Sequence, residues 1–469
     1  MQYPDHVKFL IIGAGPTGLG AAYRLKELGA GDALILEASP HVGGLASTFT
    51  DEQGFLWDVG GHVQFSHYTY FDELMIKALG ADGWLHHERE SWVWIRERFV
   101  PYPFQNNIRR LPKEELWECL QGLIALYKSP TKTPPLNFKE WIHATFGAGL
   151  SRVFMEPYNF KVWAFPLEQL SFNWIGERVA VTDVERVLKN ILFETDDVSW
   201  GPNNTFQFPK KGGTGAIWER VADLVGRESI RLNSAVQSVD TVQKRVTLRS
   251  GTTIRYDRLL NTMPLDLFAD VIDGFPAETR AAAHRLKFST SNIMGIGLEG
   301  QPPDELKKKC WMYFPESDCP FYRVTVFSNY SPGNVPDPKK HWSLMAEVSE
   351  SPAKPVDQAT LQRDVIAGLR NTRLLDDRSK IVSQWTIRVG HGYPTPSLDR
   401  DAILTAVHAE LEARGVSSRG RFGGWKYEVS NQDHSLMQGV EWVNWAVSGE
   451  PELTYFHPSK ANAFAGKKK

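Results

Sequence analysis

Three glycines near the N-terminus have the spacing that lets a backbone approach a pyrophosphate. Gly13, Gly15 and Gly18 follow the apolar run at residues 7–12. In a strand–turn–helix unit, the first glycine permits a tight turn, the second removes a colliding side chain, and the third lets the helix pack close to the strand. Amide N–H groups at the helix start then face the anion. Glu37 ends the next apolar run, where its carboxylate can accept a ribose hydroxyl and exclude a 2′-phosphate.

Two further glycine pairs, Gly43-Gly44 and Gly60-Gly61, follow this fingerprint closely. Each pair alone is more typical of an ordinary turn, and the fingerprint by itself is a weak signal. Three such sites in the first 61 residues instead indicate backbone pressed against a long ligand. We therefore predict bound FAD rather than a nicotinamide dinucleotide.

Arginines, aromatic rings and amides gather in several loop segments. The segments at residues 102–107 and 158–163 each offer rings that can stack and amides that can form hydrogen bonds. Any single arginine here could form an ordinary surface ion pair, but a diphosphate requires planar bidentate donors, which arginine supplies. This composition predicts a site for a phosphorylated ligand that carries a ring. Its expected donors are Arg178, Arg323, Arg421, Tyr313, Tyr393 and Tyr427.

The composition excludes several other classes of function. The 469 residues include 53 Lys or Arg against 55 Asp or Glu, a net charge of −2, whereas nucleic-acid binders normally carry a basic excess. The three cysteines lack metal-ligand spacing, so we expect no metal site and a reduced, cytoplasmic setting. No apolar run approaches the ~20 residues that span a bilayer, so we expect a soluble protein without membrane insertion.

The elements that position these residues indicate an α/β fold. We expect a discontinuous, Rossmann-like FAD-binding domain formed by residues 1–68, 205–290 and 390–469. Residues 69–204 carry helical patterns and are expected to form an inserted, mainly helical substrate domain. Residues 291–389 are expected to form an antiparallel sheet that floors a substrate pocket. The expected helices are at 70–79, 113–127, 138–146, 184–192 and 431–447.

Short motifs rich in aromatic, histidine and asparagine residues are spread along almost the whole chain. They are at residues 60–63, 65–68, 102–107, 157–164, 176–180, 200–203, 320–323, 391–396 and 427–435. In type and order these motifs resemble the UDP-galactopyranose mutases of the eukaryotic type. The resemblance covers far more of the chain than the glycine fingerprint does.

The resemblance implies a flavin-dependent isomerase that interconverts UDP-galactopyranose and UDP-galactofuranose without net redox change. In that family, N5 of reduced FAD attacks the anomeric carbon and displaces UDP, and the resulting flavin–sugar adduct opens as an iminium. The protein would keep the flavin reduced, anchor UDP and hold the opened sugar. NADPH or NADH would be the reductant, and the substrate partner would be a nucleotide sugar. The sequence leaves the oligomeric state open.

The resemblance also assigns roles to individual residues. Arg178 and Arg323 would clamp the diphosphate and stabilise the leaving group, and they form the expected catalytic set together with His62. The final helix would direct its positive start at the flavin, and Phe65 and His67 belong to a loop expected to move on flavin reduction. Simple packing is the alternative role for His62, Trp163 and the final helix.

Two sets of binding residues follow from the same resemblance. The expected FAD-binding residues are Gly13, Gly15, Gly18, Glu37, Gly44, Leu45, Gly61, His62, Val236, Arg421, Asn431 and Gln432. The expected substrate-binding residues are Phe65, Tyr102, Gln105, Asn159, Trp163, Arg178, Asn203, Tyr313, Arg323, Tyr393 and Tyr427.

Four positions depart from the family pattern: Gln64, Glu156, Phe165 and Ser430. They leave room for a mutase of a related NDP-sugar. Two further alternatives share the fold: an FAD-dependent oxidoreductase of the amine-oxidase or desaturase type, and a non-catalytic module like the GDP-dissociation inhibitors. The oxidoreductase would need a hydride donor and an apolar tunnel instead of an arginine–tyrosine site.

Overall fold

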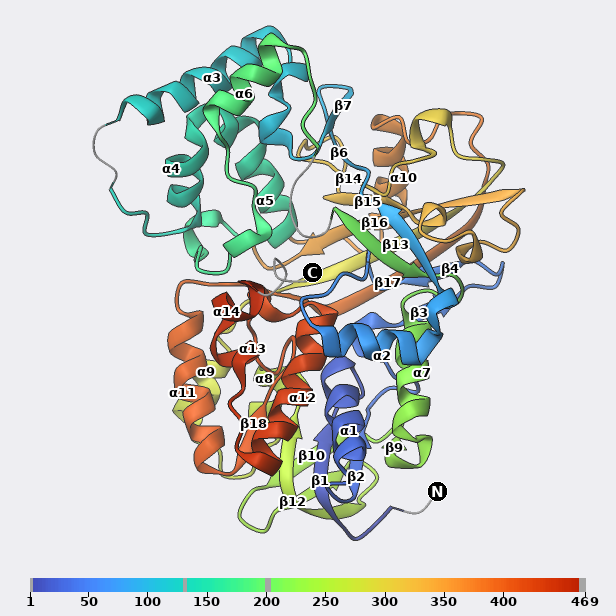
Figure 1. The fold of residues 1–469 in the computed structure, drawn as a ribbon, viewed down its shortest axis with the longest axis vertical. Helices are drawn as coiled ribbons and strands as arrows, with labels where there is room; N and C mark the ends of the chain where they lie inside the picture. Colours follow the sequence, from blue (N-terminus) through green and yellow to red (C-terminus); the bar gives the residue numbers. More distant parts are fainter. Residues whose placement is uncertain (1–2, 130–132, 199–203, 464–469) are drawn as a thin grey trace.

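The structure is a computed structural model that describes residues 3–129, 133–198 and 204–463. Two large sheets and a group of helices make up the molecule (Figure 1). The first sheet and its helices form the lower half of that view. The second sheet, the helices between residues 113 and 192 and the helix at residues 361–371 form the upper half, and the two halves meet in the middle.

In the described part of the chain, the first sheet has seven strands in the order β10-β11-β12-β1-β2-β9, with β18 paired to β12. The pairs formed by β12, β1, β2, β9 and β18 are parallel, and β10 and β11 add an antiparallel edge. The strands are β1 (His6–Ile12), β2 (Ala33–Leu36), β9 (Ile230–Arg231), β10 (Val236–Asp240), β11 (Arg245–Leu248), β12 (Thr253–Asn261) and β18 (Val416–Ser418).

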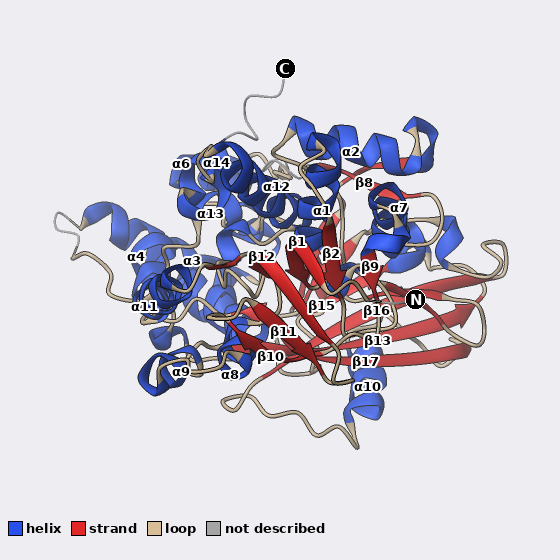
Figure 2. Ribbon diagram, turned by 90° about the horizontal axis from the view of Figure 1, so that it is seen from below, coloured by secondary structure: helices blue, strands red, loops and turns tan. Residues whose placement is uncertain are grey.

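Helices cover both faces of this sheet, which is why β1 is apolar on both sides. Phe9 and Ile11 pack on the side of α1, α7 and α12, whereas Leu10 and Ile12 pack on the side of α8, α9 and α11. This alternation follows from the two-residue period of a strand, and Figure 2 shows the two helical layers. The helices are α1 (Pro16–Leu28), α7 (Gly215–Val225), α8 (Leu265–Val271), α9 (Ala277–Ala283), α11 (Arg400–Ala413) and α12 (Gln432–Ser448).

Helices α1 and α12 pack backbone against backbone. A Cβ added to Gly439 would lie 2.0 Å from the carbonyl oxygen of Thr17, and one on Gly20 would lie 2.7 Å from the carbonyl oxygen of Leu436. Glycine at both positions therefore sets the separation of the two helices. α12 ends at Gly449, whose left-handed conformation is typical of a C-cap.

The second sheet is antiparallel except at one pair. In the described residues its order is β17-β13-β16-β15-β14-β6-β7, and only β14 and β6 run parallel. Strands β6 and β7 come from residues 69–204, which were expected to be mainly helical. This inserted region therefore contributes two strands to the second sheet, which the sequence did not suggest. The strands are β6 (Ser91–Ile95), β7 (Arg98–Pro101), β13 (Phe288–Glu299), β14 (Trp311–Tyr313), β15 (Arg323–Val326), β16 (His341–Glu350) and β17 (Ile381–Pro394).

The remaining elements complete the upper half and the ends of the lower one. The strands are β3 (Thr48–Thr50) with β4 (Leu56–Asp58), and β5 (Trp84–Glu88) with β8 (Thr205–Pro209). The helices are α2 (Thr69–Leu79), α3 (Lys113–Lys128), α4 (Phe138–Leu150), α5 (Glu156–Trp163), α6 (Val184–Leu192), α10 (Leu361–Asn371), α13 (Leu453–Phe456) and α14 (Pro458–Asn462).

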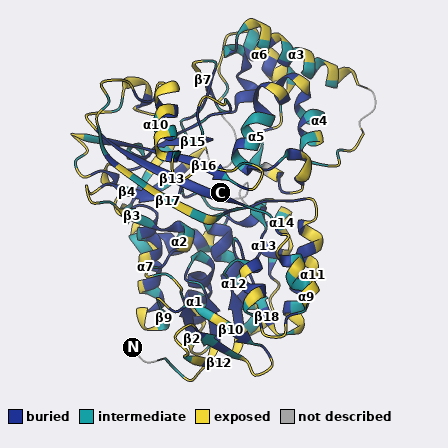
Figure 3. Cartoon of the chain, turned by 180° about the vertical axis from the view of Figure 1, so that it is seen from behind, coloured by how far each residue is buried: buried dark blue, intermediate teal, exposed yellow. Residues whose placement is uncertain are grey.

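The five predicted helices are confirmed as α2, α3, α4, α6 and α12. Burial follows the layers: strands β13 and β16 are buried along most of their length, and exposed residues gather on outer helices such as α3 and α9 (Figure 3). Among the described residues, no helix combines the length and apolarity needed to cross a bilayer.

We predict that Gly439→Ala lowers the free energy of unfolding by about 1–3 kcal/mol, because the new methyl group must push α12 away from Thr17. The loss should appear although alanine favours a helix over glycine by up to about 1 kcal/mol. Gly390→Ala is the matched control, since nothing lies within 4 Å of its added Cβ. Urea unfolding measures both, and equal stability of the two variants would contradict the proposed close approach.

Candidate functional site

Of the three fingerprint glycines, Gly13 and Gly18 are tightly packed and Gly15 faces open space; a Cβ on Gly13 would lie 2.2 Å from Oγ1 of Thr262. A Cβ on Gly18 would lie 2.0 Å from the carbonyl oxygen of Gly13, so this glycine serves the packing of α1 on β1. Gly15 is different, because the nearest atom to its added Cβ, the carbonyl oxygen of Gly43, is 4.0 Å away. Gly15 is also the N-cap of α1 and provides no side-chain cap. The helix start therefore presents amides to an open space, as an anion site requires.

The second glycine pair closes one side of this space. The amide of Gly43 donates to the carbonyl of Ala14 at 2.9 Å, and a Cβ on Gly44 would lie 3.4 Å from the Cα of Gly15. Glu37 accepts from the amides of Ala14 (2.7 Å) and Ser39 (2.8 Å). Its carboxylate thus braces the glycine loop in addition to the ribose contact that remains a prediction. Leu45 and Val236 are half-buried against the core beneath.

The third glycine pair leads into His62 and is held from the second sheet. The amide of Gly61 donates to Oε1 of Glu347 at 3.1 Å, and a Cβ on Gly61 would lie 2.9 Å from Oγ1 of Thr325. Nδ1 of His62 is buried and has no hydrogen-bond partner among the described residues. Burial, followed by the positive charge of Arg421, lowers the pKa of His62 to about 4. The imidazole is therefore neutral at pH 7.

Glu347 is the centre of a buried polar network that the sequence analysis missed. It lies directly opposite Arg323 on the neighbouring strand and accepts from Nε and Nη2 of that residue at 2.7 and 2.8 Å. The hydroxyl of Tyr322 donates to Oε2 at 2.7 Å. Burial acts to raise the pKa of Glu347, but Arg323 and these hydrogen bonds outweigh it and hold the pKa below its usual value. Glu347 is therefore an ionised carboxylate inside the protein.

Two more arginines approach the same region without a carboxylate partner among the described residues. Arg421 donates to the carbonyl of Gly392 at 3.0 Å and to Oγ of Ser430 at 3.0 Å. Arg178 donates to the carbonyl of Glu428 at 2.8 Å. Burial lowers the pKa of Arg421 from its ordinary value. Partly buried guanidinium groups that meet only neutral partners leave a positive charge for which an anion is the natural partner.

The start of α12 lies beside these arginines. Asn431 is the N-cap, but its side chain does not cap the helix; its Oδ1 instead accepts from Arg178 at 3.4 Å. Gln432 accepts from the indole of Trp218 at 2.7 Å. The positive end of this 17-residue helix therefore adds to the charge of the arginines.

An aromatic wall adjoins the arginines. The rings of Tyr102 and Tyr313 are 5.3 Å apart, and those of Trp163 and Tyr427 are 4.9 Å apart. The guanidinium of Arg178 lies 4.9 Å from the centre of the Tyr427 ring, and Arg421 lies at the same distance from the ring of Tyr393. These rings come from residues 102–107, 311–313, 390–394 and 427–429 and from Trp163. The segment at residues 158–163, which was expected to be a loop, lies in α5.

Other predicted site residues have their side chains engaged within the protein. Nδ2 of Asn159 donates back to the carbonyl of Met155 at 2.7 Å. Nε2 of Gln105 donates to the carbonyl of Ala180 at 2.6 Å, although its buried Oε1 has no partner among the described residues. The ring of Phe65 lies 5.5 Å from that of His67. Asn203 lies outside the described residues.

The four departures from the family pattern have different surroundings. Glu156 points at α4, where it bonds His143 at 2.7 Å, so its charge is partnered away from the arginines. Gln64 is buried, and its backbone pairs with Gln207. Phe165 is buried as well, with Nζ of Lys287 5.4 Å from its ring. Only Ser430 touches the site, through Arg421.

These features fit a bound flavin dinucleotide. The open space at Gly15 and the uncapped start of α1 suit a pyrophosphate. The neutral His62, the buried Arg421 and the positive start of α12 suit an electron-rich ring that carries negative charge. The groups that would bind the cofactor, from Gly15 to the start of α12, come from chain segments more than 400 residues apart in sequence.

We predict that Glu347→Ala destabilises the fold by about 3–5 kcal/mol, because it leaves Arg323 buried without its counter-charge. Glu350→Ala is the matched control: it lies on the same strand, but its partner Arg388 is half exposed, so a loss of about 0.2–1 kcal/mol is expected. Chemical denaturation of the holoprotein measures both. Equal losses of stability in the two variants would show that burial of the Arg323–Glu347 pair does not set the cost of removing the carboxylate.

We also predict an acid-sensitive contribution from His62. Its pKa of about 4 in the folded protein lies below the ordinary histidine value of 6.5, so the unfolded chain takes up the proton first as pH falls. The contribution is complete above pH 6.5 and is lost as pH falls from 6.5 to about 4. His62→Gln should therefore lose less stability than wild type across this window. Parallel pH–stability curves for the two proteins would refute the assignment.

Comparison with known proteins agrees with this geometry. Residues 16–398 match the family of flavin-containing amine oxidoreductases. The chain is similar to a solved structure of reduced UDP-galactopyranose mutase, with 46% identity over 97% of this chain and 99% of that chain and a TM-score of 0.94. A putative protoporphyrinogen oxidase from Exiguobacterium sp. 255-15 shares the fold at 16% identity over 96% of this chain and all of that chain, with a TM-score of 0.72.

Similarity to a zeta-carotene desaturase of Zea mays is local: it is 37% over 85 residues, or 17% of this chain and 15% of that protein. The similarity to the mutase structure, in contrast, includes both sheets, the inserted helices and the segments that carry the arginines. The chain therefore belongs to the flavin-containing amine oxidoreductases and, among them, to the UDP-galactopyranose mutase family.

Proposed function

We propose that this protein is an FAD-dependent mutase that interconverts UDP-galactopyranose and UDP-galactofuranose. The observation that carries this proposal is the pair of arginines, Arg178 and Arg421, that meet only neutral partners beside an aromatic wall. Such a site suits an anionic nucleotide sugar and an anionic reduced flavin together. An enzyme that oxidises an apolar amine or carotenoid would not require it.

The first task of these residues is to hold the diphosphate while the sugar bond breaks. Glu347 occupies Nε and Nη2 of Arg323, and Nη1 has no hydrogen-bond partner in the described part of the chain. The edge formed by the two terminal nitrogens can therefore contact a diphosphate without breaking the ion pair. Arg178 would provide the second clamp, and its charge would stabilise UDP as it leaves.

The second task is to hold the sugar and the base in place. Tyr393 and Tyr427 lie against Arg421 and Arg178, so their hydroxyls can complete the phosphate shell without adding charge. Burial raises the pKa of Tyr393 and Tyr313, which keeps both phenols neutral donors at pH 7. Tyr102 and Tyr313 would provide the surface on which the uridine end stacks.

The cofactor would lie between Gly15 and the start of α12, with His62 and Arg421 beside its ring. When bound and reduced, FAD would supply the nucleophile that the protein's own side chains do not offer. Arg421 would favour the negatively charged, reduced form. His62 would add no charge, because its pKa lies well below 7.

Finer features of the proposal extend the family resemblance. We propose that the protein is of the eukaryotic type, that NADPH or NADH reduces the flavin, and that the enzyme acts in the cytoplasm. A nucleotide-sugar substrate is expected, and association into an oligomer is compatible with the sequence. Ser430 at Arg421 is the departure that bears on the site, so other NDP-sugars belong in the test.

The test is to incubate dithionite-reduced holoprotein with UDP-galactofuranose and follow UDP-galactopyranose by chromatography, with other nucleotide sugars in parallel. We expect isomerisation after priming reduction and none with oxidised protein. Oxygen or NADPH consumption in step with product would instead indicate a conventional oxidoreductase. Purified protein without flavin absorbance would indicate a binding module.

We predict that Arg178→Ala lowers kcat/KM by about 10²–10³-fold, since it removes a charge that stabilises the leaving diphosphate. FAD content should stay normal. Arg227→Ala is the matched control, because this exposed arginine pairs with Asp223 on the surface of α7. Steady-state kinetics with reduced enzyme measure both, and unchanged kinetics of Arg178→Ala would remove the clamp role.

A further inference from the structure

Two buried carboxylates hold the ends of the short segment between the third glycine pair and α2. At one end, the amide of Gly61 donates to Glu347 at 3.1 Å. At the other end, the amide of His67 donates to Oδ2 of Asp433 at 3.0 Å. Glu347 belongs to the second sheet and Asp433 to α12, so segment 61–67 bridges the two halves of the molecule.

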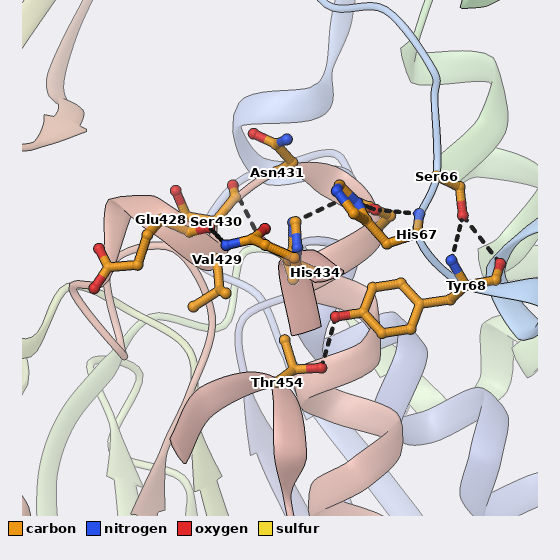
Figure 4. A network of polar contacts seen from close by, with 12 residues as sticks. Ser66, His67, Tyr68, Glu428, Val429, Ser430, Asn431, His434 and Thr454 are labelled. Carbon is orange, nitrogen blue, oxygen red and sulfur yellow. Dashed lines mark hydrogen bonds and ion pairs between the residues drawn. The ribbon is translucent and has the colours of Figure 1, made fainter. Parts of the chain in front are cut away.

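The anchor at Asp433 is the more elaborate of the two, and Figure 4 labels the two histidines beside it, His67 and His434. Nδ1 of His67 also bonds Oδ2 of Asp433, at 2.7 Å, and Nδ1 of His434 lies 3.2 Å from Oδ1. The two imidazole rings are 4.5 Å apart, and none of the three side chains exceeds 1% exposure. Burial acts to raise the pKa of Asp433, but His434 and His67 outweigh it and hold the pKa far below its usual value.

The position of Asp433 explains how this charge is tolerated. It lies in the first turn of α12, where the helix dipole favours a negative group. The imidazole and the backbone amide of His67 both bond its Oδ2, and Nδ1 of His434 lies near Oδ1 without forming a hydrogen bond. The carboxylate therefore acts as a fixed acceptor at the helix start.

The residue after the segment is tied to the same part of the fold. The hydroxyl of Tyr68 bonds Oγ1 of Thr454 at 2.8 Å, and Thr454 bonds Glu441 of α12 through its amide and its hydroxyl at 2.7 and 2.8 Å. Between the anchors, the backbone of Gln64 pairs with Gln207 on β8. Hydrogen bonds thus hold segment 61–67 at its first residue, in its middle and at its last residue.

The three side chains could in principle hold a metal ion, since their donor atoms all lie within 4.8 Å of one another. The positive start of α12 and the charge of Arg178 disfavour a cation beside His434, although the carboxylate of Asp433 acts in the opposite direction. The hydrogen bond between His67 and Asp433 also already occupies one ligand pair. A structural anchor accounts for the geometry better.

We propose that Asp433 is a positioning residue that fastens segment 61–67 to the start of α12. His62 and Phe65 on the segment, and Asn431 and Gln432 at the helix start, are thereby held as one unit around the cofactor and substrate. The anchor itself stands on the contacts alone; its consequence for turnover rests on the proposed mutase function.

The direct test is hydrogen exchange of the holoprotein, followed by mass spectrometry of peptides covering residues 61–67. Asp433→Ala removes the one oxygen, Oδ2, that both the amide and Nδ1 of His67 bond. Exchange at these amides should therefore rise on the order of tenfold or more through local opening. Asp433→Asn keeps an oxygen acceptor and should give an intermediate rise. Wild-type exchange in Asp433→Ala would overturn the proposal.

Asp266→Asn is the matched control. Asp266 forms another largely buried pair with a histidine, His391, at 2.9 Å, but it lies on α8 and does not contact the segment. It should leave exchange at residues 61–67 unchanged, and an equal rise there would show a general loosening of the fold. If Asp433→Ala does not fold, Asp433→Asn and His67→Ala must still show the rise.

Two further measurements separate the possible failures. Reduced Asp433→Asn should show a KM for the nucleotide sugar raised several-fold more than kcat is lowered, with normal FAD content. If wild type shows no isomerisation, the proposed function fails, while the exchange result still decides the anchor. Stoichiometric metal in wild type that is lost in Asp433→Asn would overturn the proposal in favour of a metal site.

Discussion

Partly buried positive charge is the constraint on which the rest of the structure depends. Arg178, Arg323 and Arg421 converge on one region, and in the described residues only Arg323 has a carboxylate partner, Glu347. An isolated buried ion costs several kcal/mol even after relaxation. Carbonyl groups, an amide and two tyrosine rings reduce that cost. The remaining imbalance makes the site a receptor for anions, which is the chemistry that both a nucleotide diphosphate and a reduced flavin present.

Each half of the molecule supplies part of this positive charge. The second sheet places Arg323 and Glu347 directly opposite each other on β15 and β16. The first half supplies Arg421 after β18 and the positive start of α12. Neither half alone forms the site, so the contacts between them decide its geometry. Segment 61–67 is one such contact, because Gly61 is bound to Glu347 and His67 to Asp433.

Local patterns made part of this arrangement predictable. The glycine fingerprint and the periodicity of α6 and α12 depend only on residues close in sequence. The glycine turn and the two helices form where expected. The β6–β7 hairpin escaped prediction because Arg96 and Glu97 adopt positive φ in its turn, where Asn-Gly is the usual signal. Glu347 is the one acid among residues 342–348, within the region expected to form the antiparallel sheet. Its partner, however, depends on strand register, which no local pattern reveals. Likewise, 366 residues separate His67 from Asp433.

The carboxylate of Glu347 accepts hydrogen bonds from both Arg323 and the amide of Gly61, so it can couple the two parts of the site. An anion on the outer edge of Arg323 would draw the guanidinium toward itself and weaken its two bonds to Glu347. Glu347 would then bond the amide of Gly61 more strongly, because that amide is its remaining backbone donor in the described residues. The effect is limited to a fraction of one charge-assisted hydrogen bond, about 1.5–3 kcal/mol. Coupling of that size is within the usual range for two linked sites. Diphosphate and flavin would therefore influence each other's binding through Glu347 and the backbone at His62, and linkage requires the influence to be mutual.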